Sequence, residues 1–194
     1  MNHKEGKVDK AIVPGSIKAV AKGGDVALAM LDAKIVLLCD RSSSMLEKDA
    51  FNRKARYEVE DQIVKRLQTK YPGQIVLVSF RDWSDIHPDG ELPYPSGMTN
   101  MTAGLEKAQP LIEAGLRAVL ISDGEPDDPY SVMELAKQLK GKLDVCYVGP
   151  EGSGGQQFLH EVARVAMGTF DTNDLKNPQL LEERITRLLL KAGT

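Results

Sequence analysis

The chain has 194 residues, enough for one domain with a short extension. Hydrophobic residues make up 42% and charged residues 27% of it, a composition that excludes a disordered or fibrous protein. The formal net charge of -3 argues against nucleic acid or an anionic membrane surface as the main partner.

The N-terminal segment "MNHKEGKVDK" lacks the apolar stretch of a secretory signal, and no part of the chain approaches about 18 consecutive apolar residues. Cys39 and Cys146 lie inside apolar runs, and the chain has no Cys-x-x-Cys pair. Small buried thiols of this kind are typical of a reducing compartment. We therefore expect a cytoplasmic protein that does not enter a membrane.

The first expected element is a short or broken helix in residues 16–33, "SIKAVAKGGDVALAMLDA", interrupted by Gly23-Gly24. We assign residues 1–33 to an N-terminal extension and residues 34–191 to the main domain. The domain opens with "KIVLLC" (34–39), a continuous apolar run that indicates a strand buried on both faces of a parallel sheet.

Further apolar runs alternate with segments of helical periodicity. The expected strands are 74–80, 117–122, 143–149 and a short last one at 169–172, with an edge strand near Ile86 or Leu92. The expected helices are 51–73, 99–115, 131–141, 156–168 and 177–191. Strands alternating with helices of this length predict an α/β fold with a mostly parallel sheet.

Ligands of such sheets bind outside the carboxyl ends of the strands, so the residues at these exits are the candidates for function. The first strand ends in Asp40, Ser42 and Ser44, in the pattern D-x-S-x-S. A later loop offers Thr99, and Asp123 directly follows the third buried strand. Two carboxylates and three hydroxyls from separate loops suit a hard cation such as Mg²⁺, which takes about six oxygen ligands.

Helix capping is the alternative role for some of these residues. Ser44 begins a Ser-x-x-Glu capping box, and Thr99 or Asn100 could cap the next helix. Asp128 before a proline is best explained as a cap. Capping does not account for Asp40, which ends a buried strand, or for Ser42 and Asp123, so the joint pattern favours a metal site.

D-x-S-x-S after a buried strand, the later Gly-x-Thr loop and a strand followed by Asp-Gly resemble the metal-ion-dependent adhesion site of von Willebrand factor type A (vWA) domains. The resemblance covers roughly residues 34–190. It implies a doubly wound, Rossmann-like sheet, parallel except for one short antiparallel edge strand, with helices on both faces. It also implies that the metal site consists of Asp40, Ser42, Ser44, Thr99 and Asp123.

The function implied by this resemblance is a non-enzymatic protein-binding module. Mg²⁺ or Mn²⁺ at the site would engage an Asp or Glu of a protein partner within a multiprotein assembly. Intracellular members of the family serve in assemblies that include AAA+ ATPases, and such an ATPase system is therefore an expected partner.

Two alternatives stay open at this stage. A phosphotransferase of the haloacid-dehalogenase type would use Asp40 as nucleophile, although its second Asp would fall where this chain has Ser42. A structural subunit without metal would instead dock through the helix in residues 16–33.

Overall fold

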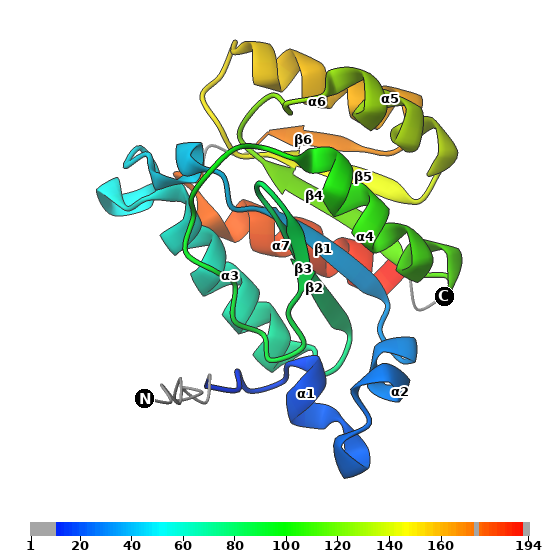
Figure 1. The fold of residues 1–194 in the computed structure, drawn as a ribbon. Helices are drawn as coiled ribbons and strands as arrows, with labels where there is room; N and C mark the ends of the chain where they lie inside the picture. Colours follow the sequence, from blue (N-terminus) through cyan, green and yellow to red (C-terminus); the bar gives the residue numbers. More distant parts are fainter. Residues whose placement is uncertain (1–10, 173–174, 192–194) are drawn as a thin grey trace, which may run out of the picture.

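A computed structural model describes residues 11–172 and 175–191. Its centre is a six-stranded sheet in the order β3-β2-β1-β4-β5-β6, in which β3 alone runs antiparallel to its neighbour (Figure 1). The strands are β1 (Ile35–Asp40), β2 (Ile75–Phe80), β3 (Ser84–Ile86), β4 (Arg117–Ser122), β5 (Leu143–Tyr147) and β6 (Phe170–Thr172). The predicted α/β class, with one antiparallel edge strand, is confirmed.

The continuous apolar runs form the central strands because helices cover both faces of the sheet. Every residue of β1 and β2 is buried, and the two strands pair in parallel from Ile35 opposite Ile75 to Asp40 opposite Phe80. The edge strand forms at Ile86, whereas the alternative position near Leu92 lies in a loop. Its half-exposed side chains fit an edge position.

Helices pack on both faces of the sheet, as predicted (Figure 1). One face carries α4 (Met101–Glu113), α5 (Pro129–Gln138) and α6 (Gly154–Val165). The other carries α3 (Arg56–Lys70) and α7 (Pro178–Lys191). Each layer has its own cluster of buried side chains, so the sheet separates two hydrophobic cores.

Helix α3 starts five residues later than the apolar periodicity predicts. A short 3₁₀ turn, η3 (Phe51–Arg53), precedes it, with Asn52 and Arg53 in the left-handed region. An α-helix cannot continue through two residues of that conformation. The loop from the end of β1 to α3 therefore stays irregular and is free to shape the site described below.

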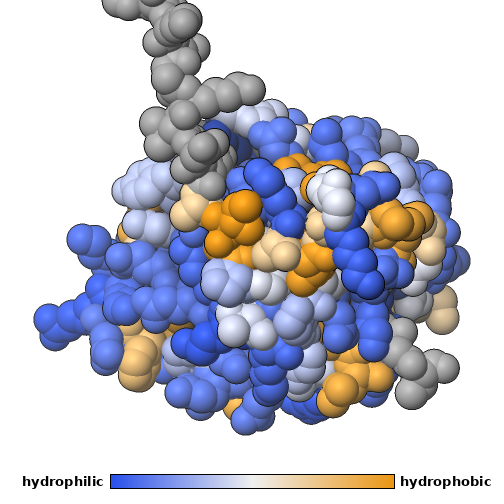
Figure 2. Space-filling model, turned by 90° about the horizontal axis from the view of Figure 1, so that it is seen from below, coloured by the Kyte–Doolittle hydropathy of each residue, from blue (hydrophilic) through white to orange (hydrophobic). Residues whose placement is uncertain are grey.

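The N-terminal segment forms α1 (Ile17–Val20), the 3₁₀ turn η1 (Lys22–Gly24) and α2 (Val26–Leu31). The interruption falls at Gly23 and Gly24, which both have positive φ, as the broken-helix interpretation requires. Figure 2 views this end from below and shows small groups of exposed hydrophobic side chains. The division into an extension (1–33) and a domain (34–191) stays a prediction, and residues 1–10 lie outside the described part.

Across residues 11–172 and 175–191, the structure contains no helix of the length and hydrophobicity that a membrane crossing requires.

Candidate metal centre

The candidate site lies where the chain order of the sheet reverses. From β1 the chain continues to β2 on one side, while β4 pairs with β1 on the other. Asp40 is the last residue of β1, and Asp123 directly follows the last residue of β4. Because parallel strands end at the same edge, the two carboxylates meet at the topological switch point, where α/β sheets bind ligands.

Asp40 is fully buried, and within residues 11–172 and 175–191 only neutral groups donate hydrogen bonds to it. Its Oδ1 accepts the Ser42 N–H at 2.8 Å, and its Oδ2 accepts the Ser122 hydroxyl at 2.6 Å. Burial, together with the nearby charge of Asp123, raises the pKa of Asp40 to about 6. Asp40 is thus a buried acceptor whose negative charge no hydrogen-bonded cation balances within the described residues.

A chain of hydrogen bonds connects the loop after β1, called the first loop below, to the second carboxylate, that of Asp123. The Ser42 and Ser44 hydroxyls lie 2.9 Å apart, and Ser44 Oγ donates to Asp123 Oδ1 at 2.7 Å. The capping interpretation of Ser44 is wrong, because Ser44 lies inside a single 3₁₀ turn, η2 (Ser43–Leu46), which starts before it and ends before Glu47. The Ser44 side chain therefore points to the second carboxylate and not to a helix end.

Thr99 lies in the loop before α4, beside the segment that follows Asp123. Its N–H donates to Asp127 Oδ1 at 3.3 Å, and its carbonyl accepts the Asp127 N–H at 3.1 Å. The same loop contacts the first one, since Ser43 N–H donates to the Gly97 carbonyl at 3.1 Å. The three sequence-predicted loops therefore meet, although no hydrogen bond among the described residues joins Thr99 to the other four candidates.

The helix caps settle which neighbours are structural. Asn100, not Thr99, caps α4 by accepting the Ala103 N–H at 3.1 Å. Asp128 caps α5 by accepting the Ser131 N–H at 3.1 Å, as predicted. With these caps accounted for, Thr99 has no capping role.

Sequence reasoning missed two residues that contact the site, Ser122 and Arg56, and a third, Asp49, that holds Arg56. Ser122 donates to Asp40, and Arg56 donates to Asp123 through Nη1 at 2.5 Å. Arg56 also binds Asp49 through Nε and Nη2, at 2.8 and 2.5 Å. The sequence carried no signal for Arg56, because the helix was predicted to begin at residue 51 and only the structure makes Arg56 its first residue.

A second buried charge cluster underlies the first loop. Arg41, between two predicted ligands, is fully buried and lies 2.5 Å from Asp61 and 3.2 Å from Glu60, both on α3. Burial, only partly offset by Arg41, raises the pKa of Glu60 to about 8. This cluster ties the loop to α3 and holds the backbone of the D-x-S-x-S segment in place.

The donor set has the chemistry of a site for a hard divalent cation. Two carboxylates and two hydroxyls form one hydrogen-bonded group at the carboxyl ends of β1 and β4. Mg²⁺ in proteins is typically bound by neutral oxygens and few carboxylates. In the described part of the chain no cluster of three or more His, Cys, Asp or Glu side chains is placed to hold a metal. A site here would therefore depend on the serine hydroxyls.

Comparisons with known proteins identify the fold of the chain. No family model and no curated protein matches the chain. Among solved structures, an aerotolerance-related membrane protein from Bacteroides fragilis aligns with a TM-score of 0.61 at 16% identity, over 82% of this chain and 99% of that one. A von Willebrand factor type A protein from Catenulispora acidiphila gives 0.54 at 16% identity, over 82% of this chain and 43% of that one.

A third structure is the manganese-loaded TRAP protein of Plasmodium vivax. It aligns with a TM-score of 0.51 at 19% identity, over 70% of this chain and 63% of that one. At such identities the likeness concerns the fold alone. The chain thus has the α/β fold of vWA domains, and the chemistry of its site has to be argued from its own residues.

Proposed function

On the premise of this fold, we propose that the protein is a non-enzymatic binding module that holds Mg²⁺ or Mn²⁺ at a metal-ion-dependent adhesion site. Asp40, Ser42, Ser44, Thr99 and Asp123 are its ligands, directly or through water. An Asp or Glu of a protein partner completes the coordination. The manganese in the TRAP structure supports this choice of ion.

The observation that carries the proposal is the hydrogen-bonded group of Asp40, Ser42, Ser44 and Asp123 at the switch point. A cation there would supply the positive charge that Asp40 lacks. Neutral hydroxyl ligands leave such an ion electron-poor, and it would then bind an external carboxylate strongly. The role of this chain's residues is to fix the ion and leave one position for the partner.

The surroundings of the site suit a protein partner. Trp83, Tyr94 and Met98 are exposed, although aromatic residues make up only 5% of the chain. They belong to the segment that packs on the first loop, where Ser96 N–H donates to the Arg41 carbonyl at 2.8 Å. Tryptophan, tyrosine and methionine are enriched in protein interfaces.

The wider setting of the proposal is a cytoplasmic assembly containing an AAA+ ATPase. Cys39 and Cys146 are free and buried, which is compatible with a reducing compartment.

Thermal unfolding with Mg²⁺, Mn²⁺ or EDTA tests the metal site. A cation bound only by the folded chain adds about 1.4 kcal/mol at ten times its dissociation constant. For a chain of this size the melting temperature then rises by roughly 3–5 °C. Asp40→Asn should abolish the rise, whereas Ser43→Ala, which changes an exposed neighbour in the same motif, should retain it. Equal melting temperatures with metal and with EDTA would contradict the proposed site.

Selection of displayed random peptides against the immobilised protein tests the partner chemistry. In Mn²⁺ buffer the recovered peptides should be enriched in Asp and Glu, and EDTA should release them. Peptides without acidic residues, or binding that survives both EDTA and Asp123→Ala, would refute engagement through the metal.

A further inference from the structure

One cation of the chain itself already contacts the proposed metal site. The guanidinium of Arg56 donates through Nη1 to Asp123 Oδ2 at 2.5 Å, while the other oxygen of Asp123 accepts the Ser44 hydroxyl. The Arg56 side chain is 6% exposed and that of Asp123 is fully buried. Asp123 therefore differs from Asp40, because its charge is balanced from within the protein.

The position of Arg56 is unfavourable except for its two carboxylate partners. It is the first residue of α3, where the helix macrodipole repels a cation, and its burial carries a desolvation penalty. Although burial opposes it, hydrogen bonding to Asp49 and Asp123 raises the pKa of Arg56, so the guanidinium stays charged. In this structure a positive charge therefore lies against a carboxylate of the site.

The two partners hold Arg56 differently. Asp49 is half-exposed and receives a bidentate pair of hydrogen bonds from Nε and Nη2. Asp123 receives a single one, from Nη1. The fork on Asp49 can therefore persist while the contact with Asp123 breaks, so the guanidinium has a second position that keeps a counter-ion.

We infer that Arg56 is an internal counter-ion that competes with the divalent cation for Asp123, with Asp49 retaining the guanidinium when metal binds. This inference rests on the proposed function. Two cations on one carboxylate repel each other strongly here, because the Arg56 and Asp123 side chains are almost fully buried. Metal affinity is accordingly set by the balance between Asp49 and Asp123 as partners of Arg56, in addition to the ligands themselves.

The balance predicts opposite effects of two substitutions. Arg56→Met removes the competing charge and keeps an apolar stem, so Mn²⁺ should bind at least about tenfold more tightly. Asp49→Asn leaves Arg56 with Asp123 as its one anionic partner, so Mn²⁺ should bind several-fold more weakly. A purely structural role for the Arg56 pairs would weaken binding in both variants.

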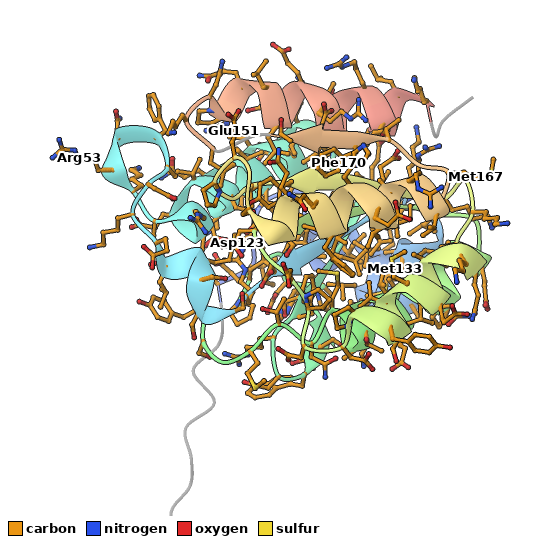
Figure 3. The ribbon with its side chains drawn as sticks, turned by 90° about the horizontal axis from the view of Figure 1, so that it is seen from above. Arg53, Asp123, Met133, Glu151, Met167 and Phe170 are labelled. Atoms are coloured by element: carbon orange, nitrogen blue, oxygen red, sulfur yellow. The ribbon has the colours of Figure 1, made fainter. Side chains whose placement is uncertain are left out.

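Isothermal titration of the full chain with Mn²⁺ measures both effects. Arg53→Met is the matched control, because it removes the same charge from an exposed side chain that points away from Asp123 (Figure 3). It should leave the dissociation constant within about twofold, since solvent and salt screen exposed charges. Denaturant unfolding adds a second readout: Arg56→Met should lose stability in EDTA and regain it in Mn²⁺ by a larger shift than the native chain.

The outcomes separate this inference from the proposed function. If Arg56→Met binds Mn²⁺ no more tightly than the native chain, while Asp40→Asn abolishes binding in both, the inference is wrong and the metal site stands. Equal tightening by Arg53→Met also overturns it. If no variant binds Mn²⁺, both fail. Should Arg56→Met not fold, Arg56→Gln, a neutral side chain whose amide can still donate a hydrogen bond, must bind Mn²⁺ more tightly than the native chain for the inference to hold.

Discussion

Two buried carboxylates at opposite ends of the same sheet have opposite electrostatic surroundings. Asp144, near the start of β5, receives hydrogen bonds from the Arg117 guanidinium and from the Thr169 N–H and hydroxyl. Although burial alone would raise the pKa of Asp144, these partners lower it. Asp40, at the end of β1, receives hydrogen bonds only from neutral groups in the part of the chain that the structure describes, and burial raises its pKa.

The difference shows what distinguishes a structural carboxylate from a candidate ligand. At the amino end of the sheet, the charge of Asp144 is balanced by Arg117 and the pair stabilises the fold. At the carboxyl end, Asp40 is desolvated without a hydrogen-bonded cation, a state that favours protonation or an added cation. Asp123 lies between these cases, because Arg56 supplies a charge that can be displaced.

The largest change in stability is expected from substitution of Asp144, whose charge is balanced by Arg117. Asp144→Ala removes the partner of Arg117 and two further hydrogen bonds, from Thr169, and should lower the free energy of unfolding by about 3 kcal/mol. Urea denaturation measures it. Asp171→Ala, which breaks a more exposed pair with Arg184, should lose less than about 1 kcal/mol. Equal losses of stability in the two variants would contradict a special role of the buried pair.

A pH series tests a third buried carboxylate, Glu60. Because burial raises its pKa to about 8 from 4.5, its contribution to stability is greatest below the lower value and is lost as pH rises through the higher one. Above pH 7, where the raised pKa still lies about one unit higher, the free energy of unfolding should fall by about 1.4 kcal/mol. Above about pH 7, Asp40 is already ionised, so the slope there isolates Glu60. Glu60→Gln should flatten it; an unchanged slope would refute this origin.

A smaller change in stability is expected from substitution of Asp40. In EDTA at pH 7, Asp40→Asn removes a desolvated charge and keeps the side-chain shape, so the chain should gain about 1 kcal/mol in stability. The amide can still accept from Ser42 N–H and can donate to the Ser122 hydroxyl. Denaturant unfolding beside Asp144→Asn makes the comparison direct. A loss of stability similar to that of Asp144→Asn would show that both carboxylates are structural.

The smallest effect is expected at Ser43, which lies within the motif but outside the hydrogen-bonded group. Its exposed hydroxyl donates to the Gly97 carbonyl at 3.0 Å. Ser43→Ala should change stability by less than about 0.5 kcal/mol, since exposed substitutions rarely exceed this. Calorimetry of the variant provides the measurement, and a loss above about 1 kcal/mol would show that this contact fixes the loop.

Local patterns in the sequence were sufficient for most of the fold. Continuous apolar runs predicted the buried strands because both faces of a parallel sheet are covered, and they located Asp40 and Asp123 at strand ends. The order of the strands in the structure makes these two ends neighbours. The Asp128 cap was equally local, because an N-cap bonds a residue three positions on. The start of α3 was predicted too early, since apolar spacing carries no signal for the left-handed residues Asn52 and Arg53.

The sequence by itself therefore determined the α/β class and the set of strand-end oxygens, since the spacing of apolar residues along a strand or helix is a local pattern. Only the tertiary structure decided which side chains meet. Arg56 and Asp123 are 67 positions apart, and Asp40 and Ser122 are 82 apart. No periodicity relates such pairs, because their contact depends on how the loop after β1, helix α3 and strand β4 pack together. The same packing places the Ser44 hydroxyl against Asp123, and not at a helix end, where a capping role would require it.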